Sequence, residues 1–142
     1  MKLIELTCKN EILQTYEIYK YCMFMPTEEK FSAKIDWFLN DNSIKILACF
    51  KEDKVEGVIV ISFLDRSKIK IIGLAVDFSA RGKGVGSYMI NKVVDDYGLH
   101  AVYAETDADA VGFYRKNDFV ITEFLEIYDD KTVVRYRCEL NK

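Results

Sequence analysis

Residues 69–98 read IKIIGLAV DFSA RGKGVG SYMINKVVDDY G, and this stretch decides how the chain folds. The first eight residues are rich in Ile and Val and are bounded by turn residues, which is typical of a buried strand. A loop follows with glycines at positions 82, 84 and 86 and cations at positions 81 and 83. Apolar residues then recur at helical spacing, and Gly98 stands where a glycine commonly ends a helix. The stretch therefore predicts a strand, a glycine-rich loop and a helix in succession.

The glycine-rich loop indicates an anion-binding site, with phosphate as the expected group. A helix start carries unpaired backbone N–H groups and the positive end of the helix dipole. Glycines remove the side chains that would keep a ligand's oxygens away from those N–H groups, and Arg81 and Lys83 add positive charge. The alternative is a tight turn with two solvated cations, but three alternate glycines exceed what a turn requires.

Two common phosphate loops fit this spacing less well. The P-loop pattern G-x-x-x-x-G-K-[ST] is absent. The dinucleotide fingerprint G-x-G-x-x-G would place its third glycine at position 87, which is Ser87. Glu105 does stand about 20 residues further on, where a ribose-binding acid is expected, so a Rossmann-like nucleotide-binding module remains an alternative.

The loop resembles the acetyl-CoA loop of the GNAT superfamily of N-acetyltransferases. That family has [Q/R]-x-x-G-x-[G/A] after a strand ending in L-x-V, and the sequence LAVDFSARGKGVG at residues 74–86 matches each position. A second segment, AVGFYRKNDF at residues 110–119, resembles the family's A-x-x-F/L-Y-x-K-x-G-F pattern. Two motifs in this order and about this far apart make the resemblance specific.

Length and composition fit one globular domain spanning residues 1–142. Half of the residues are hydrophobic and 30% are charged, and the net charge of −3 argues against nucleic acid as the main partner. No apolar run approaches the roughly 20 residues of a membrane span, and the first residues lack a signal peptide, so we expect a cytoplasmic protein that does not bind membranes. The four cysteines are scattered and predict reduced thiols, with neither a disulfide nor a metal site.

The remaining sequence predicts elements on both sides of the organising stretch. Helices are expected at residues 11–22 and 28–39, the second capped by Thr27, with Met23, Phe24 and Met25 between them as candidate lining of a substrate pocket. A further helix with a capping box at Thr106 and Asp109 is expected to run to about Lys116. Predicted strands lie at residues 2–8, 43–50, 55–64, 69–76, 101–105, 119–128 and 132–140.

Side-chain patterns within these strands add detail. Residues 58–64 are apolar on both faces, which predicts a central strand under helices on each side, and the last strand alternates so that one face is wet. The resemblance implies a mixed α/β fold. Its sheet would be mostly antiparallel with a splayed parallel strand pair, residues 69–76 and 101–105, and helices on both faces.

The resemblance also implies a set of residues that hold acetyl-CoA. The pantetheine arm would pair with the open strand edge, where the main chain of Leu74, Ala75 and Val76 lies and the Val76 N–H is a candidate oxyanion donor. The pyrophosphate would lie on the amides of Arg81, Gly82, Lys83, Gly84, Val85, Gly86 and Ser87. Asp107 stands where many relatives carry an Asn that bonds the cofactor arm, and an ionised acid cannot donate that hydrogen bond.

Catalysis would need an acid for the departing thiolate and a base for the amine. Tyr114 matches the family tyrosine that faces the sulfur of CoA and acts as general acid. Glu105 is the candidate base because the strand at residues 69–76 contains no carboxylate. Asp77 with a water chain is an alternative, and Asp36 is either an attractor of a cationic acceptor or an ordinary surface residue.

A second departure from the family pattern concerns Asp118, which replaces a glycine. If this residue is left-handed, we expect Asp118→Gly to raise the free energy of unfolding by about 0.4–1 kcal/mol. A variant with a lower melting temperature would contradict that geometry.

The sequence therefore predicts an acetyl-CoA-dependent N-acetyltransferase that acts on a primary amine by direct attack in a ternary complex. An alternative is a GNAT-like domain that binds acyl-CoA without useful turnover, as a sensor or structural module. The acceptor is a small-molecule or peptide amine whose identity the sequence leaves open. The protein is expected to be a monomer or a homodimer.

Overall fold

The computed structural model describes all residues from Met1 to Lys142. The elements in chain order are β1 (Lys2–Leu6), α1 (Lys9–Leu13), α2 (Tyr16–Tyr19), the short helix η1 (Lys20–Cys22), α3 (Glu28–Asn40), β2 (Ile44–Lys51), β3 (Lys54–Phe63), β4 (Lys68–Val76), η2 (Phe78–Ala80), α4 (Val85–Tyr97), β5 (Ala101–Thr106), α5 (Val111–Lys116), β6 (Val120–Tyr128) and β7 (Lys131–Asn141). The predicted strands are therefore all present, with ends shifted by a few residues.

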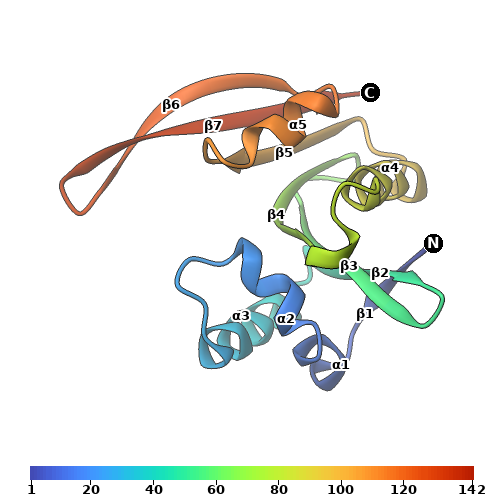
Figure 1. The fold of residues 1–142 in the computed structure, drawn as a ribbon. Coiled ribbons are helices and arrows are strands. Elements are labelled where there is room, and N and C mark those ends of the chain that lie inside the picture. Colours follow the sequence, from blue (N-terminus) through green and yellow to red (C-terminus); the bar gives the residue numbers. More distant parts are fainter.

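The strands form one seven-stranded sheet in the order β1-β2-β3-β4-β5-β7-β6. Every neighbouring pair is antiparallel except β4 and β5, as the resemblance implied. These two strands pair only where residues 68–70 meet residues 101–103, and beyond that point they separate. Figure 1 shows β5, β6 and β7 lying apart from the other strands past this junction. The sheet therefore opens along the second half of β4.

Helices cover both faces of the sheet, and each face has its own apolar core. One core lies under α4 and α5 and includes Met89, Val93 and Tyr114. The other lies under α1, α2 and α3 and includes Ile12, Phe31 and Ile35. Figure 1 shows these two groups of helices on opposite sides of the sheet. Residues 58–61 of β3 are buried, alternating between the two cores, which confirms the predicted central strand.

The predicted helix at residues 11–22 is wrong as a single element. The chain forms α1, α2 and η1 in succession, with a break at Thr15. The Thr15 backbone N–H and hydroxyl both donate to the carbonyl oxygen of Ile12, at 2.9 and 2.7 Å. A threonine side chain that competes for a backbone carbonyl in this way interrupts a helix.

The last hairpin is only partly covered. In β7 the side chains of Cys138 and Leu140 are buried, whereas Val134 on the same face is 42% exposed. The predicted solvent-exposed face of this strand is present. The opposite, apolar face is buried only at the end of the strand that carries Cys138 and Leu140. Figure 1 shows the far end of the β6–β7 hairpin extending beyond α5.

Candidate active site

The opening between β4 and β5 is a cleft of about 930 Å³. Its wall comes from η1, the free half of β4, the glycine-rich loop, the start of α4, the end of β5, and α5. This volume is in the range of sites that hold a cofactor-sized ligand. The cleft brings together these sequence-predicted residues: Leu74, Ala75, Val76, Arg81, Gly82, Gly84, Val85, Gly86, Ser87, Glu105, Asp107 and Tyr114. Lys83 was predicted with them and does not line the cleft.

The cleft side of β4 presents backbone groups without a strand partner. The Asp77 N–H points toward β3, where it donates to the carbonyl oxygen of Glu56 at 2.8 Å. Because backbone groups alternate along a strand, the N–H groups of Leu74 and Val76 point the opposite way, toward the opening. Pairing with β5 stops at Lys70, so this edge can receive an extended, amide-containing ligand.

The glycine-rich loop leads into α4 through two left-handed backbone conformations that favour glycine. Gly82 and Gly84 have φ angles of +75° and +82°, in the left-handed region. Gly84 is the N-cap of α4 and has no side chain to satisfy the first helical amides. The N–H groups of Val85, Gly86 and Ser87 therefore have no acceptor within the helix, and all three residues line the cleft.

Gly86 has a different role from Gly84. It lies within the helix, and a β-carbon at this position would come within 2.8 Å of the Phe113 ring. The glycine therefore allows the first turn of α4 to pack against α5. This contact keeps the exposed amides of α4 next to the element that carries Tyr114.

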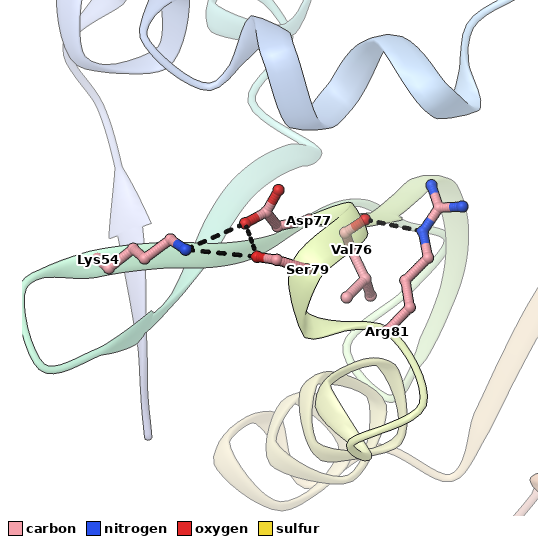
Figure 2. Close-up of polar contacts among 5 residues, drawn as sticks. All are labelled: Lys54, Val76, Asp77, Ser79 and Arg81. Atoms are coloured by element: carbon pink, nitrogen blue, oxygen red, sulfur yellow. Dashed lines mark hydrogen bonds and ion pairs between the residues drawn. The ribbon is translucent and has the colours of Figure 1, made fainter.

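Arg81 does not point at the amides of α4. Its Nε donates to the carbonyl oxygen of Val76 at 3.3 Å, as Figure 2 shows. The guanidinium carbon lies 4.8 Å from the Tyr21 ring centroid and 5.4 Å from that of Phe78. Cation–π contacts at these distances hold the charge at the mouth of the cleft.

Asp77 and its neighbours brace the turn that follows β4. The Ser79 hydroxyl donates to Asp77 Oδ2 at 2.8 Å, and Lys54 Nζ lies 3.4 Å from the same oxygen (Figure 2). The hydrogen bond from Ser79 is the main cause that lowers the pKa of Asp77, and Lys54 adds to it. Asp77 does not line the cleft, and its lowered pKa makes it a poor proton acceptor. The alternative of Asp77 as the base is therefore disfavoured.

Tyr114 combines a buried ring with a place in the cleft wall. The residue is 6% exposed, and its ring makes edge contacts with Phe113 and Phe119 at centroid distances of 5.2 Å. Burial is the main cause that raises the pKa of its hydroxyl above the ordinary value, so the phenol holds its proton over the physiological range. Tyr114 therefore brings a neutral phenol to the cleft that the free half of β4 also lines.

Glu105 lies near the end of β5 and also lines the cleft. Its Oε1 is 3.6 Å from Lys70 Nζ on β4, and both side chains are partly exposed, at 39% and 44%. An ion pair this exposed contributes little to stability. The carboxylate is therefore available to solvent and to a ligand.

Asp107 and Asp118 both have roles in the local backbone structure around α5. Asp107 Oδ1 accepts from the N–H groups of Asp109 and Ala110, at 3.0 and 3.2 Å, so this carboxylate organises the entry to α5. The capping box predicted at Thr106 and Asp109 is wrong, because Thr106 is the last residue of β5. Asp118 has a φ of +69°, which confirms the left-handed geometry expected where relatives carry glycine.

Sequence reasoning missed several residues of the cleft. Tyr21 and Cys22 belong to η1, Asn117 follows α5, and Arg135 lies on β7. Only the aromatic and Met-rich segment gave a signal: Met23 and Phe24 line the cleft as predicted, and Met25 does not. Asp36 lies elsewhere, on α3, where it accepts from Lys9 Nζ at 2.7 Å, so it is an ordinary surface residue.

Cys22 brings a thiol to the cleft wall. The residue is exposed, but its Sγ lies 3.2 Å from the carbonyl oxygen of Tyr19, and partial desolvation of the thiol raises its pKa. A thiol with a raised pKa stays protonated, so Cys22 is a weak nucleophile.

Gly73 allows the helices on the other face to approach the open strand. A β-carbon at this position would lie 2.1 Å from the Tyr19 hydroxyl, which is impossible without movement. The Tyr19 ring therefore packs directly on the backbone of β4, one residue before Leu74. This contact sets the distance between η1 and the strand edge.

Residues 11–119 match the sequence profile described as the acetyltransferase (GNAT) family. The chain belongs to this acetyltransferase family. No curated protein sequence matches the chain significantly. In this chain the glycine-rich loop, the free edge of β4 and Tyr114 line one continuous cleft.

Solved acetyltransferase structures share the fold over almost their whole length. One is a GNAT family acetyltransferase from Elizabethkingia anophelis with acetyl-CoA bound, at 16% identity and a TM-score of 0.71, covering 99% of this chain and 97% of that one. Another is a variant of spermidine N-acetyltransferase from Vibrio cholerae, at 13% identity and a TM-score of 0.76, covering 99% and 95%. A third is the ribosomal-protein-S18-alanine N-acetyltransferase from Escherichia coli, at 15% identity and a TM-score of 0.72, covering 99% and 92%. At these identities the likeness is one of fold.

Two further observations concern metals and membranes. No group of three His, Cys, Asp or Glu side chains is arranged to hold a metal ion. None of the helices is long and apolar enough to span a membrane.

Proposed function

We propose that residues 1–142 form a single N-acetyltransferase domain that moves the acetyl group of acetyl-CoA to a primary amine. Family membership supports acetyl transfer as the general chemistry. One observation carries the finer proposal: free strand amides, free helix amides and a neutral phenol line the same cleft. A thioester with a peptide-like arm and a diphosphate needs these three features.

The donor would be held by backbone groups. The amides of Val85, Gly86 and Ser87 would receive the pyrophosphate at the positive end of α4. The edge of β4 at Leu74 and Val76 would pair with the pantetheine arm as an added strand. Arg81, at the cleft mouth, would close on the phosphates by leaving the Val76 carbonyl.

The chemical step would be direct attack. The neutral amine attacks the thioester carbonyl, and the Val76 N–H stabilises the developing oxyanion. The C–S bond then breaks, the departing thiolate takes the proton of Tyr114, and the amine proton passes to Glu105 directly or through water. The raised pKa of Cys22 argues against an acetyl-cysteine intermediate.

The test is acetyl-CoA-dependent release of CoA thiol across a broad amine library, with acetyl-CoA alone as the blank. We expect amine-dependent release well above the blank for at least one class. A protein that binds acetyl-CoA but releases no thiol with any amine would contradict the enzyme proposal and favour the acyl-CoA-binding alternative. A thermal shift with NAD and none with acetyl-CoA would favour the nucleotide-binding alternative.

A further inference from the structure

Arg135 is a charged residue of the cleft to which the acetyl-transfer proposal gives no role. Its side chain lines the cleft from β7. Its Nε is buried and has no hydrogen-bond partner. Glu126 Oε2 lies 3.6 Å from this Nε, so the two side chains form a partly exposed ion pair without a hydrogen bond. A buried guanidinium N–H without an acceptor is costly, and an anionic ligand would relieve that cost.

The sheet places Arg135 with Glu105 and not with the glycine-rich loop. In strand order, β5 separates β7 from β4, the strand that leads into the loop. Glu105 is directly opposite Arg137 in the β5–β7 register. Arg135 is two residues further along β7, so it is on the same face as Glu105 and diagonal to it, with β-carbons about 7 Å apart. This face of β5 and β7 therefore carries Glu105 and two guanidinium groups, of which only that of Arg135 lines the cleft.

This pairing of charges matches a ligand that has an amine and a carboxylate. Glu105 is the proposed partner of the amine, and the guanidinium fork is the side chain best suited to a carboxylate. The other cations on this face are Arg137, which stacks on Phe124 at 4.5 Å and does not line the cleft, and Lys70, which is 3.6 Å from Glu105. Met23 and Phe24 add apolar side chains to the wall of the same cleft, and Phe24 is 87% exposed.

We propose that Arg135 is a specificity residue that binds the carboxylate of the acceptor, so that the acceptor is a small amino acid-like molecule. This inference rests on the proposed acetyl transfer and narrows it to one class of amine. A simple polyamine or alkylamine would leave the Arg135 Nε without an acceptor.

Matched pairs of acceptors test the proposal. Glycine, β-alanine, 4-aminobutanoate and L-phenylalanine are each compared with their amides, which keep the amine and lose only the carboxylate. Amino acid amides have less basic amines, so their intrinsic reactivity at neutral pH is higher. We expect kcat/KM for the acid to exceed kcat/KM for its amide by about tenfold or more in at least one pair. Such a preference would be the opposite of the difference in intrinsic reactivity.

Three variants assign the preference to the side chain. Arg135→Met should raise KM for the preferred acid by about 10- to 100-fold and leave KM for its amide unchanged. Arg135→Lys should retain part of the preference, because the charge remains without the fork. Arg137→Met is the matched control: Arg137 does not line the cleft and stacks on Phe124 at 4.5 Å, so the preference should persist. The dissociation constant of acetyl-CoA reports whether each variant is folded.

The outcomes separate this inference from the proposed function. If amines are acetylated but no acid is preferred over its amide, the carboxylate site is refuted and acetyl transfer stands. If Arg135→Met and Arg137→Met change the acid preference equally, Arg135 has no specific role. If no amine of any kind is acetylated, both proposals fail together.

Discussion

At the scale of single residues, Tyr114 is held by the packing of its ring and still lines the cleft. Phe113 and Phe119 pack against the ring, and the residue is 6% exposed while still lining the cleft. A packed ring positions a proton donor at little further entropic cost when a ligand binds. The same burial raises its pKa.

Tyr114→Phe removes the proposed acid and keeps the packing. We expect kcat to fall by about 10²-fold or more, because proton transfer from a positioned group typically contributes that much. The dissociation constant of acetyl-CoA should change little, as measured by calorimetry. Tyr97→Phe is the control, since Tyr97 also packs against this core and does not line the cleft. Equal activity of wild type and Tyr114→Phe would remove the acid role.

The pH dependence follows from the direction of the Tyr114 shift. The phenol must be protonated to donate, and its pKa is raised, so its donating form persists above the ordinary value of about 10. The rate should rise with pH as the amine loses its proton, with no falling limb from Tyr114 up to about pH 10. A profile of kcat/KM against pH checks this expectation. A falling limb near neutrality that Tyr114→Phe abolishes would contradict it.

At the scale of elements, Gly84 and Gly98 form a natural pair for testing the loop. Both are left-handed glycines at the ends of α4, with φ angles of +82° and +61°, and a β-carbon at either would meet nothing within 4 Å. A side chain at either position would impose a similar backbone strain, but only Gly84 lines the cleft. Gly86 is a poorer test, because substitution there would strike Phe113.

Gly84→Glu should abolish acetyl-CoA binding, because its carboxylate would stand beside the amides proposed to receive the pyrophosphate. Gly98→Glu should carry a similar loss of stability, about 1–2 kcal/mol for a left-handed non-glycine residue, and still bind. Calorimetric titration and thermal melting of both variants measure the two effects. Equal affinity of Gly84→Glu and wild type would refute the loop assignment.

The sequence predicted those strands and helices that are indicated by the spacing of residues within a short stretch of chain. The strand, loop and helix at residues 69–98 follow from periodicity and glycine spacing, and the splayed parallel pair follows from the family resemblance. The break at Thr15 was missed, because whether a threonine hydroxyl takes a backbone carbonyl depends on the helices packed around it. Arg135 was missed because it belongs to the same polar row of β7 as Arg137 and Glu139, and only the cleft, which is formed by distant segments, distinguishes it from them.

At the scale of the whole molecule, the sheet consists of two parts held by a short junction. Strands β1 to β4 form one part and β5, β7 and β6 the other, and β4 meets β5 over only three register pairs. A ligand in the cleft would contact both parts. Its binding energy would therefore add to the stability of the junction.

Acetyl-CoA at a hundred times its dissociation constant should raise the free energy of unfolding by about 2.7 kcal/mol, or roughly 5–10 °C in melting temperature. Hydrogen exchange should slow most at the amides of Leu74, Val76 and residues 85–87, which lack partners in the sheet and in α4. Amides between β2 and β3 are already paired and are the internal control. Saturating acetyl-CoA without new protection at these positions would contradict the proposed binding mode.

The contact between Gly73 and Tyr19 has a consequence for how this cleft can diversify. The two positions behave as one unit: a side chain at 73 is incompatible with a large ring at 19. Any chain that gains even a methyl group at 73 must shrink residue 19 or lift the first helices off the sheet. The spacing between α2 and β4 can therefore change only when residues 19 and 73 are substituted together. A change at one of the two positions alone would not be tolerated.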